Sequence, residues 1–223
     1  MFGILNYAGY LAATVALCLT PGIDTIYIVT KTVAGGRGEG LASALGINTG
    51  LVVHTVLVAT GLSLLLAASE VAFTAIKVAG AAYLVVMGVR SVLSRDNALA
   101  AAAEADESGE SPQGADARGG RPALRTYAQG VLTNVLNPKI ILFFLALLPQ
   151  FVTTPNGFGP VPFLVLGLTY TVVSTIWTLV LVLLAAPFSR LLRRNAGAGR
   201  VTNVVSGVIY MILGGMVFVT SRS

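Results

Sequence analysis

Six long apolar stretches, separated by charged or Gly/Pro-rich breaks, dominate the pattern of the chain. Each is at least as long as the ~20 apolar residues with which a helix spans a bilayer. They are Leu5–Val33, Leu41–Ala68, Val71–Val92, Tyr127–Val152, Pro162–Pro187 and Val201–Thr220. The pattern predicts an all-α integral membrane protein with six transmembrane helices. The first stretch lacks a basic flank and exceeds the ~7–15 apolar residues of a signal peptide, so we expect a retained helix.

Composition supports a membrane protein, and the placement of charge predicts its orientation. The 223 residues are 55% hydrophobic and 10% charged, with a mean hydropathy of +0.84, which a water-soluble fold cannot bury. Most of the fourteen Lys and Arg residues lie near the first, third and fifth connections between the apolar stretches. Basic loops stay in the cytoplasm. We therefore predict a multi-pass protein of a bacterial plasma membrane, with both termini outside the cytoplasm and no nucleic-acid partner.

A hydrophilic stretch divides the apolar segments into two sets of three. Residues 94–124 hold most of the acidic residues among Ala, Gly and Ser, which is typical of a disordered linker. We predict one transporter domain with halves at 1–93 and 125–223 and a cytoplasmic linker between them. Both halves contain a Gly-x-x-Tyr motif, at Gly80 and Gly207. Halves of three helices take opposite orientations, the inverted-repeat plan of many secondary transporters.

The first apolar segment contains an interruption and the only acidic residue well inside a predicted span. Thr20, Pro21 and Gly22 break the helix, because Pro lacks a backbone donor and Gly loosens the next turn. Asp24 follows, and an unpaired charge in the bilayer costs roughly 2.5–3.5 kcal/mol. We expect these residues to bind substrate or couple protons. The alternatives are a packing kink for the break and, for Asp24, a structural ion pair with Lys31 or Lys139 or a position shallow enough to reach the membrane interface.

The fourth segment carries a second interruption beside a cation. Asn137 and Pro138 break the helix, Asn134 lies about one turn earlier, and Lys139 follows. Lys139 and backbone amides freed by the break could hold a substrate carboxylate. Alternatively, Lys139 reaches a membrane interface and the Asn side chains bind neighbouring helices. The pattern also predicts that the two breaks meet near the bilayer midplane and place Asp24 and Lys139 around one cavity.

His54 and a polar stripe on the fifth segment are further candidates. His54, the only histidine, titrates near neutrality and could relay protons, or it bonds to a neighbouring helix. The polar stripe can line a substrate path or join helices. It consists of Thr171, Ser174, Thr175 and Thr178.

The residues give no support to metal, cofactor or enzymatic chemistry. One cysteine, Cys18, and one histidine are too few for a His/Cys-rich metal site. The chain contains no HExxH pair, GxSxG elbow or P-loop. We expect no enzyme, no metal and no cofactor, and transport that this chain does not drive by ATP hydrolysis.

Several motifs together resemble the lysine exporter (LysE) superfamily, in its homoserine and threonine efflux branch. The matching stretches are Leu19 to Thr25, Ala44 to Gly50, Lys77 to Leu84 with Gly88, and Gln129 to Lys139 with Leu148 to Phe151. Relatives commonly have Pro where this chain has Ile23, which would make the first break less rigid here. The resemblance implies an amino-acid efflux permease driven by the proton motive force. It places the site at Pro21, Gly22, Asp24, Asn134, Asn137, Pro138 and Lys139.

The predicted function is therefore export of amino acids or related small metabolites by a secondary transporter. Its partners are the substrate, protons and the lipid bilayer, and a homodimer is compatible with this function. A single intramembrane acid with a cation nearby suits a zwitterion, which favours a neutral amino acid. A passive small-solute channel and a non-transport membrane scaffold remain alternatives.

Overall fold

The computed structural model describes most of the chain as a bundle of helices. The described residues are 3–93, 122–153, 157–194, 204–209, 211–212 and 215. Among them the secondary structure is helical except for one isolated antiparallel bridge, between Ile4 and Val152. The expected linker at 94–124 lies outside these residues up to residue 121, and its last three residues are helical.

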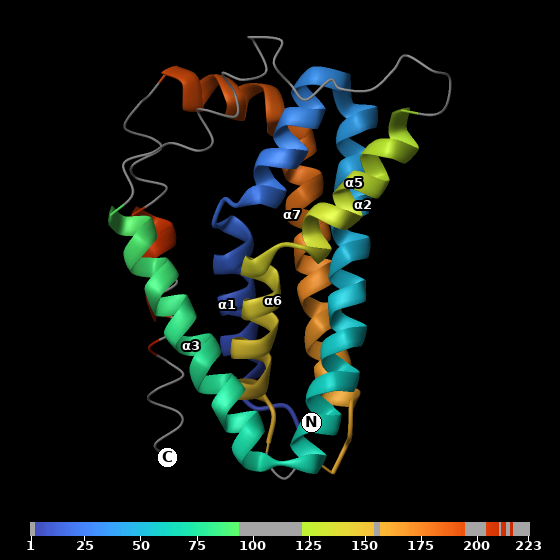
Figure 1. Ribbon diagram of the computed structural model, residues 1–223. Helices are drawn as coiled ribbons and strands as arrows, with labels where there is room; N and C mark the ends of the chain where they lie inside the picture. Colours follow the sequence, from blue (N-terminus) through green and yellow to red (C-terminus); the bar gives the residue numbers. More distant parts are fainter. Residues whose placement is uncertain are drawn as a thin grey trace.

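Seven helical elements with defined bounds make up the described part of the bundle (Figure 1). They are α1 (Tyr7–Leu19), α2 (Ile23–Ala68), α3 (Glu70–Leu93), α5 (Pro122–Val135), α6 (Pro138–Leu147), the 3₁₀ helix η1 (Leu148–Phe151) and α7 (Val161–Arg194). Residues 204–209 are also helical. The fold is thus all-α, as predicted.

Helix lengths in the described residues do not by themselves give the six expected spans. Three helices are long and apolar enough to cross a membrane, within α2, α3 and α7. The pair formed by α5 with α6 and η1 is a fourth if it is one span bent by 48°. The difference arises because α1 is short, α2 merges parts of two expected spans, and the stretch Val201–Thr220 lies largely outside the described residues.

A glycine turn inside α2 marks the boundary between the first two expected segments. Gly36 has φ 78° and ψ −177°, a left-handed backbone conformation that glycine adopts without a Cβ clash. In Figure 1 the blue part of α2 rises to the upper end of the bundle, and the cyan part descends from it. The chain therefore reverses direction near Gly36, and the two parts of α2 run antiparallel, as the apolar pattern predicted.

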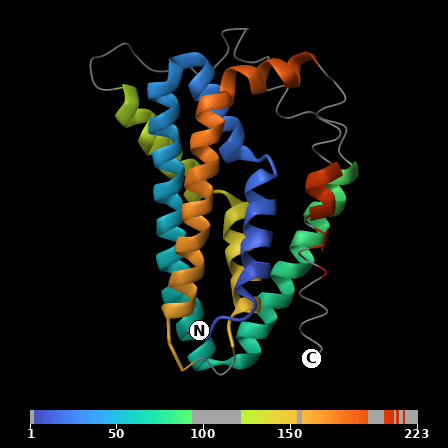
Figure 2. The same cartoon turned by 180° about the vertical axis from the view of Figure 1, so that it is seen from behind.

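Close helix contacts hold the centre of the bundle together. α2 packs along both α5 and α7, and Figure 2 shows α2 and α7 side by side from behind. At the crossing of α2 and α5, a Cβ on Gly46 would overlap the Tyr127 carbonyl oxygen, and a Cβ on Gly130 would lie 2.9 Å from the Ser43 carbonyl oxygen. Small residues allow such close backbone approach between membrane helices.

An aromatic core lies between α1, α6 and α7. Phe143 and Phe144 of α6 pack with Tyr170 of α7 at ring-centroid distances of 5.0 and 5.4 Å. The buried Tyr10 hydroxyl donates a hydrogen bond of 2.7 Å to the Leu166 carbonyl oxygen and ties α1 to α7. This core fixes the helices on one side of the two breaks.

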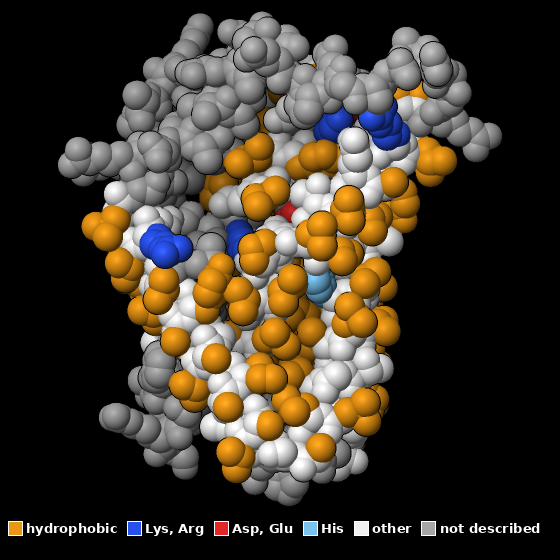
Figure 3. Space-filling view, in the orientation of Figure 1, with side chains coloured by type: hydrophobic (Ala, Val, Ile, Leu, Met, Phe, Trp, Pro, Cys, Tyr) orange, Lys and Arg blue, Asp and Glu red, His pale blue; other side chains and the backbone are white. Residues whose placement is uncertain are grey.

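On the face shown in Figure 3, the described side chains are mostly apolar and the basic ones gather toward one end. Figure 3 shows hydrophobic side chains over most of the coloured face, with the coloured Lys and Arg side chains in the upper half of the view. Arg37 follows the Gly36 turn, and Arg125 lies in the first turns of α5. An apolar exterior is the surface that a lipid-embedded bundle presents.

Candidate functional site

Two helix breaks face each other inside the bundle. The first follows α1, where Thr20 leaves the helical conformation (φ −77°, ψ 110°) and Gly22 precedes α2. The second lies between α5 and α6, where Asn137 has φ −73° and ψ 108°. Pro138 starts α6, a position where its missing N–H leaves no intrahelical bond unmade. Both breaks occur at the Pro residues that the sequence analysis identified.

Two asparagines hold the carboxylate of Asp24. Asn134 Nδ2 donates to Asp24 Oδ2 at 2.9 Å, and Asn137 Nδ2 donates to Asp24 Oδ1 at 3.1 Å. Asp24 also lies in the first turn of α2, where the helix dipole favours a negative charge. These neutral donors and the dipole stabilise a carboxylate in the interior without neutralising it.

Lys139 reaches across to the other break. Its Nζ donates a hydrogen bond of 2.8 Å to the carbonyl oxygen of Thr20, which caps the C-terminal end of α1. A cation is stabilised at a helix C-terminus, whereas the first turn of α6, where Lys139 is placed, disfavours it. The Asn137 side chain completes the link, because its Oδ1 accepts from the Lys139 backbone N–H at 3.0 Å and caps α6. Hydrogen bonds from residues at the second break therefore link it to the residues at the first.

Gly22 provides the space that the Lys139 side chain needs. A Cβ at Gly22 would lie 3.2 Å from Lys139 Nζ and 3.4 Å from its Cδ. The backbone at Gly22 is extended, with φ −151°, so the conformation itself does not demand glycine. The close approach of the Lys139 side chain is the reason a larger residue would disturb this position.

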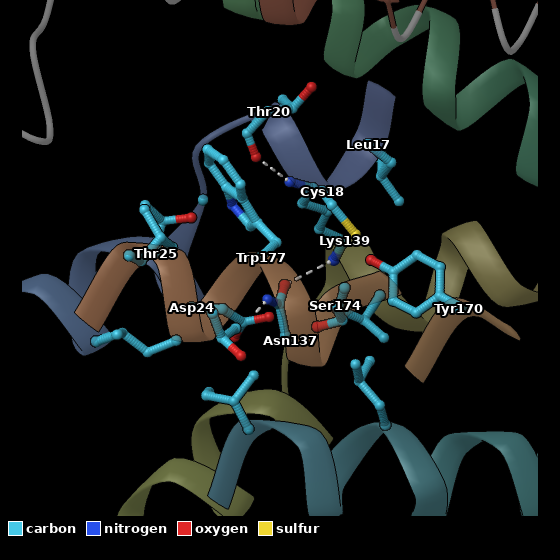
Figure 4. A pocket seen from close by; sticks show the side chains of 17 residues that line it. Leu17, Cys18, Thr20, Asp24, Thr25, Asn137, Lys139, Tyr170, Ser174 and Trp177 are labelled. Carbon is cyan, nitrogen blue, oxygen red and sulfur yellow. Dashed lines mark hydrogen bonds between the residues drawn. The ribbon is translucent and has the colours of Figure 1, made fainter. Parts of the chain in front are cut away.

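A small cavity lined by both polar and apolar side chains lies where the breaks meet α7. Its volume is about 40 Å³, enough for water-sized molecules but well below the ~300–1,000 Å³ of ligand pockets. Its polar and aromatic lining comprises Cys18, Thr20, Asp24, Thr25, Asn137, Lys139, Tyr170, Ser174, Trp177 and Thr178 (Figure 4). An amino acid does not fit this volume, so it enters only when the helices move apart.

The structure brings most of the predicted site residues together. Thr20, Gly22, Asp24, Asn137 and Lys139 line the cavity, in agreement with the expectation that the acid and the cation share one. Asn134 is fully buried and supports Asp24 from α5. The two prolines, Pro21 and Pro138, form the breaks and are not among the residues that line the cavity.

His54 lies apart from this cavity. Its Nε2 is 3.1 Å from the Asn134 carbonyl oxygen, so it reaches the Asp24 cluster only through Asn134. The ring borders a second cavity of about 420 Å³, whose other lining residues are apolar and belong to α2, α3, α5 and α6. Of the two alternatives for His54, the bond to a neighbouring helix is observed. Among the described residues, no group of His, Cys, Asp and Glu is arranged to hold a metal ion.

The four residues of the predicted polar stripe on α7 do not share one environment. Ser174 and Thr178 of the predicted polar stripe line the cavity, whereas Thr171 and Thr175 donate to carbonyl oxygens one turn earlier in α7. Trp177 also lines the cavity and was not predicted. The available signal was its spacing, because a residue three positions after Ser174 shares its helix face.

An all-helical bundle with an apolar exterior and two broken helices around an internal charged cavity has the architecture of a membrane transport protein. Residues 15–221 match the family model of the LysE type translocator. The chain therefore belongs to the LysE family, which confirms the resemblance seen in its motifs. Membership of a translocator family also confirms the prediction that the chain is not an enzyme.

Curated relatives match between 75% and 94% of the chain. An uncharacterized membrane protein, YrhP, of Bacillus subtilis (strain 168) is 30% identical over 92% of this chain and 94% of its own length. A leucine efflux protein of Klebsiella pneumoniae is 26% identical over 94% and 93%. A homoserine/homoserine lactone efflux protein of Salmonella typhi is 34% identical over 75% and 74%. No solved structure matches the chain.

Proposed function

We propose that the protein is a secondary transporter that exports neutral amino acids from the bacterial cytoplasm, driven by the proton motive force. The observation that carries this proposal is the cavity between the two helix breaks, which Asp24 and Lys139 both line. Opposite charges at one site complement a zwitterion, with the ammonium at Asp24 and the carboxylate at Lys139. Relatives named as leucine and homoserine efflux proteins support an amino-acid substrate.

The contacts of the closed site suggest how substrate would be exchanged. Asp24 accepts from two Asn side chains, and Lys139 donates to the Thr20 carbonyl oxygen. A zwitterion would replace these contacts with stronger charge-assisted ones, and its release would restore them. Each buried charge thus has partners in both states, which lowers the cost of emptying the site.

Proton coupling follows from a carboxylate that binds the substrate ammonium. An outward-facing site is exposed to the higher proton concentration, so Asp24 takes up a proton and releases the ammonium. The neutral side chain then returns to face the cytoplasm, loses its proton and binds the next substrate. One proton enters for each zwitterion that leaves, so the proton gradient drives export.

A six-span inverted repeat gives this exchange a structural basis. The segment formed by α1 and the first part of α2 has the same helix–break–helix plan as α5 with α6, and each break is followed by a charged residue. An axis in the membrane plane that relates these elements would place the breaks together near the midplane. Rocking one half against the other would then expose the site to each side in turn.

The test is efflux from cells preloaded with a panel of amino acids. We expect concentrative export that an uncoupler abolishes, and no concentrative export by Asp24→Asn at equal membrane abundance, because Asn cannot exchange a proton. Asp24→Glu keeps a titratable group and should retain partial export. Thr60→Val is a control, since the Thr60 hydroxyl is exposed and bonds only within its own helix.

The alternatives give different results in the same assay. A passive channel equilibrates substrate without concentrating it, and a scaffold exports nothing and tolerates Asp24→Asn. Full concentrative export by Asp24→Asn would exclude this residue from coupling.

A further inference from the structure

Trp177 presents a buried hydrogen-bond donor that no described residue satisfies. It is the only tryptophan in the sequence and lines the cavity that contains Asp24 and Lys139. Its indole Nε1 is shielded from solvent and has no hydrogen-bond partner. Buried N–H groups are paired in the great majority of cases, and an unpaired one calls for an explanation. A donor at the wall of a polar cavity is explained if a ligand supplies the acceptor.

The surroundings of Trp177 hold its ring in place. Its apolar body packs against the buried cluster of Ile28, Ile47 and Leu181. The next residue, Thr178, accepts a hydrogen bond of 3.0 Å from Asn48 Nδ2, which fixes α7 against α2. Figure 4 shows the indole reaching from α7 between Thr20 and Asp24. Trp177 therefore belongs to the lining of the same cavity as Asp24 and Lys139.

We propose that the Trp177 indole N–H binds a carboxyl oxygen of the exported amino acid, together with Lys139. This inference rests on the proposed function. The indole can only donate a hydrogen bond, and the substrate ammonium can also only donate, so the ammonium cannot be its partner. An amino acid with an apolar side chain has one acceptor group, its carboxylate. Trp177 and Asp24 then hold opposite ends of the zwitterion and fix its orientation.

The same orientation selects the substrate side chain. Once the ammonium and the carboxylate are held, the side chain must contact the remaining walls. These walls are formed by Leu17, Ile28, Ile47, Leu51, Ile140 and Leu181. A charged side chain placed there would lose its hydration without gaining a partner. The site thus fits α-amino acids with uncharged, apolar side chains, for which L-leucine is a suitable probe.

The single tryptophan makes this contact directly observable. The full chain in liposomes is titrated with L-leucine while the emission of Trp177 is recorded. We expect a saturable change with L-leucine, a smaller one with isoamylamine, which is leucine without its carboxylate and binds through its ammonium alone, and none with L-lysine. Asp24→Asn should remove the response, since the ammonium loses its partner. An unchanged emission with L-leucine, in a protein that exports it, would overturn the contact.

Removal of the N–H alone tests its contribution to transport. Trp177→Phe keeps an aromatic ring and loses the donor, so we expect the KM for L-leucine efflux from proteoliposomes to rise about ten- to hundredfold, while kcat changes less than about threefold. Inhibition by isoamylamine should be the same in both proteins. Thr171→Val is the matched control on α7, because its hydroxyl bonds within the helix and does not line the cavity.

The outcomes separate this inference from the proposed function. An unchanged KM in Trp177→Phe, or an equal loss of isoamylamine inhibition, would show that the N–H does not bind the carboxylate even though export continues. Absence of export for every amino acid in the parent protein would instead overturn the proposed function.

Discussion

At the scale of single residues, the site depends on side chains that each have more than one contact. Asn137 donates to the Asp24 carboxylate through Nδ2 and caps α6 through Oδ1. Asn134 donates to the same carboxylate, and its backbone carbonyl oxygen contacts His54. One substitution therefore alters helix stability and site electrostatics together, and a suitable pair of variants can separate the two.

Asn137→Ala should lose both functions of the side chain. The lost N-cap costs about 1 kcal/mol, and the lost hydrogen bond to a charged group costs about 1.5–3 kcal/mol. We expect a lower Tm in detergent and weaker export. Asn137→Ser retains a capping oxygen and loses the amide donor, so its Tm should fall less while its export stays impaired. Equal Tm values for the two variants would show that the cap contributes nothing to stability.

At the scale of helices, glycine residues determine how closely α2 and α5 approach each other. Gly46 of α2 and Gly130 of α5 allow the two backbones to approach, and this contact brings Asn134 of α5 within reach of Asp24. A Cβ at Gly50, one turn further along α2, would lie 2.7 Å from the Asn134 side chain. The packing of α2 on α5 therefore determines where the amide donors of Asp24 lie.

Gly46→Ala should separate α2 from α5. The added Cβ meets the backbone of α5, which cannot move aside as a flexible side chain can, and overpacking of this kind costs about 1–3 kcal/mol. We expect a lower Tm and reduced export. The matched control is Gly61→Ala in the same helix, because no atom lies within 4 Å of a Cβ there. Replacing Gly by Ala inside a helix removes a helix-propensity cost of about 1 kcal/mol, so the Tm of that variant should be unchanged or higher.

At the scale of the whole molecule, transport requires that the site widen and open to each side in turn. The cavity of about 40 Å³ is too small for an amino acid, so the bundle must adopt other conformations during a cycle. The broken helices are suited to this, since the segments on either side of a break can move separately. Basic residues lie near the Gly36 turn and the start of α5, so the positive-inside rule predicts that the upper end in Figure 1 is the cytoplasmic one.

The orientation can be measured with two cysteines that the fold tolerates. Gly38 and Gly157 are exposed and have no atom within 4 Å of an added Cβ. In a Cys18→Ser background, a membrane-impermeant thiol reagent applied to intact cells should label Gly157→Cys and not Gly38→Cys. Permeabilised cells should show both labelled, which controls for reactivity. The opposite pattern in intact cells would invert the predicted topology.

Local properties of the sequence were sufficient for much of the fold and part of the site. The length of an apolar segment and the positions of Lys and Arg determine the free energy of placing each segment in lipid or in water. They therefore predict membrane spans and orientation without knowledge of packing. Pro21 and Pro138 act on their own backbone, so both breaks were predicted where they occur. Asp24 and Lys139 were candidates because a charge in an apolar segment is costly wherever the segment packs.

The groups that these residues contact depend on how the helices pack. The donors to Asp24 come from residues more than a hundred positions away, and Lys139 bonds the Thr20 carbonyl oxygen. Trp177 was missed for the same reason, since its spacing places it on the helix face of Ser174 but does not show whether that face lines a cavity. Periodicity determines which face of a helix a residue occupies, but the neighbour of that face depends on helix packing, and here glycine contacts between α2 and α5 set it.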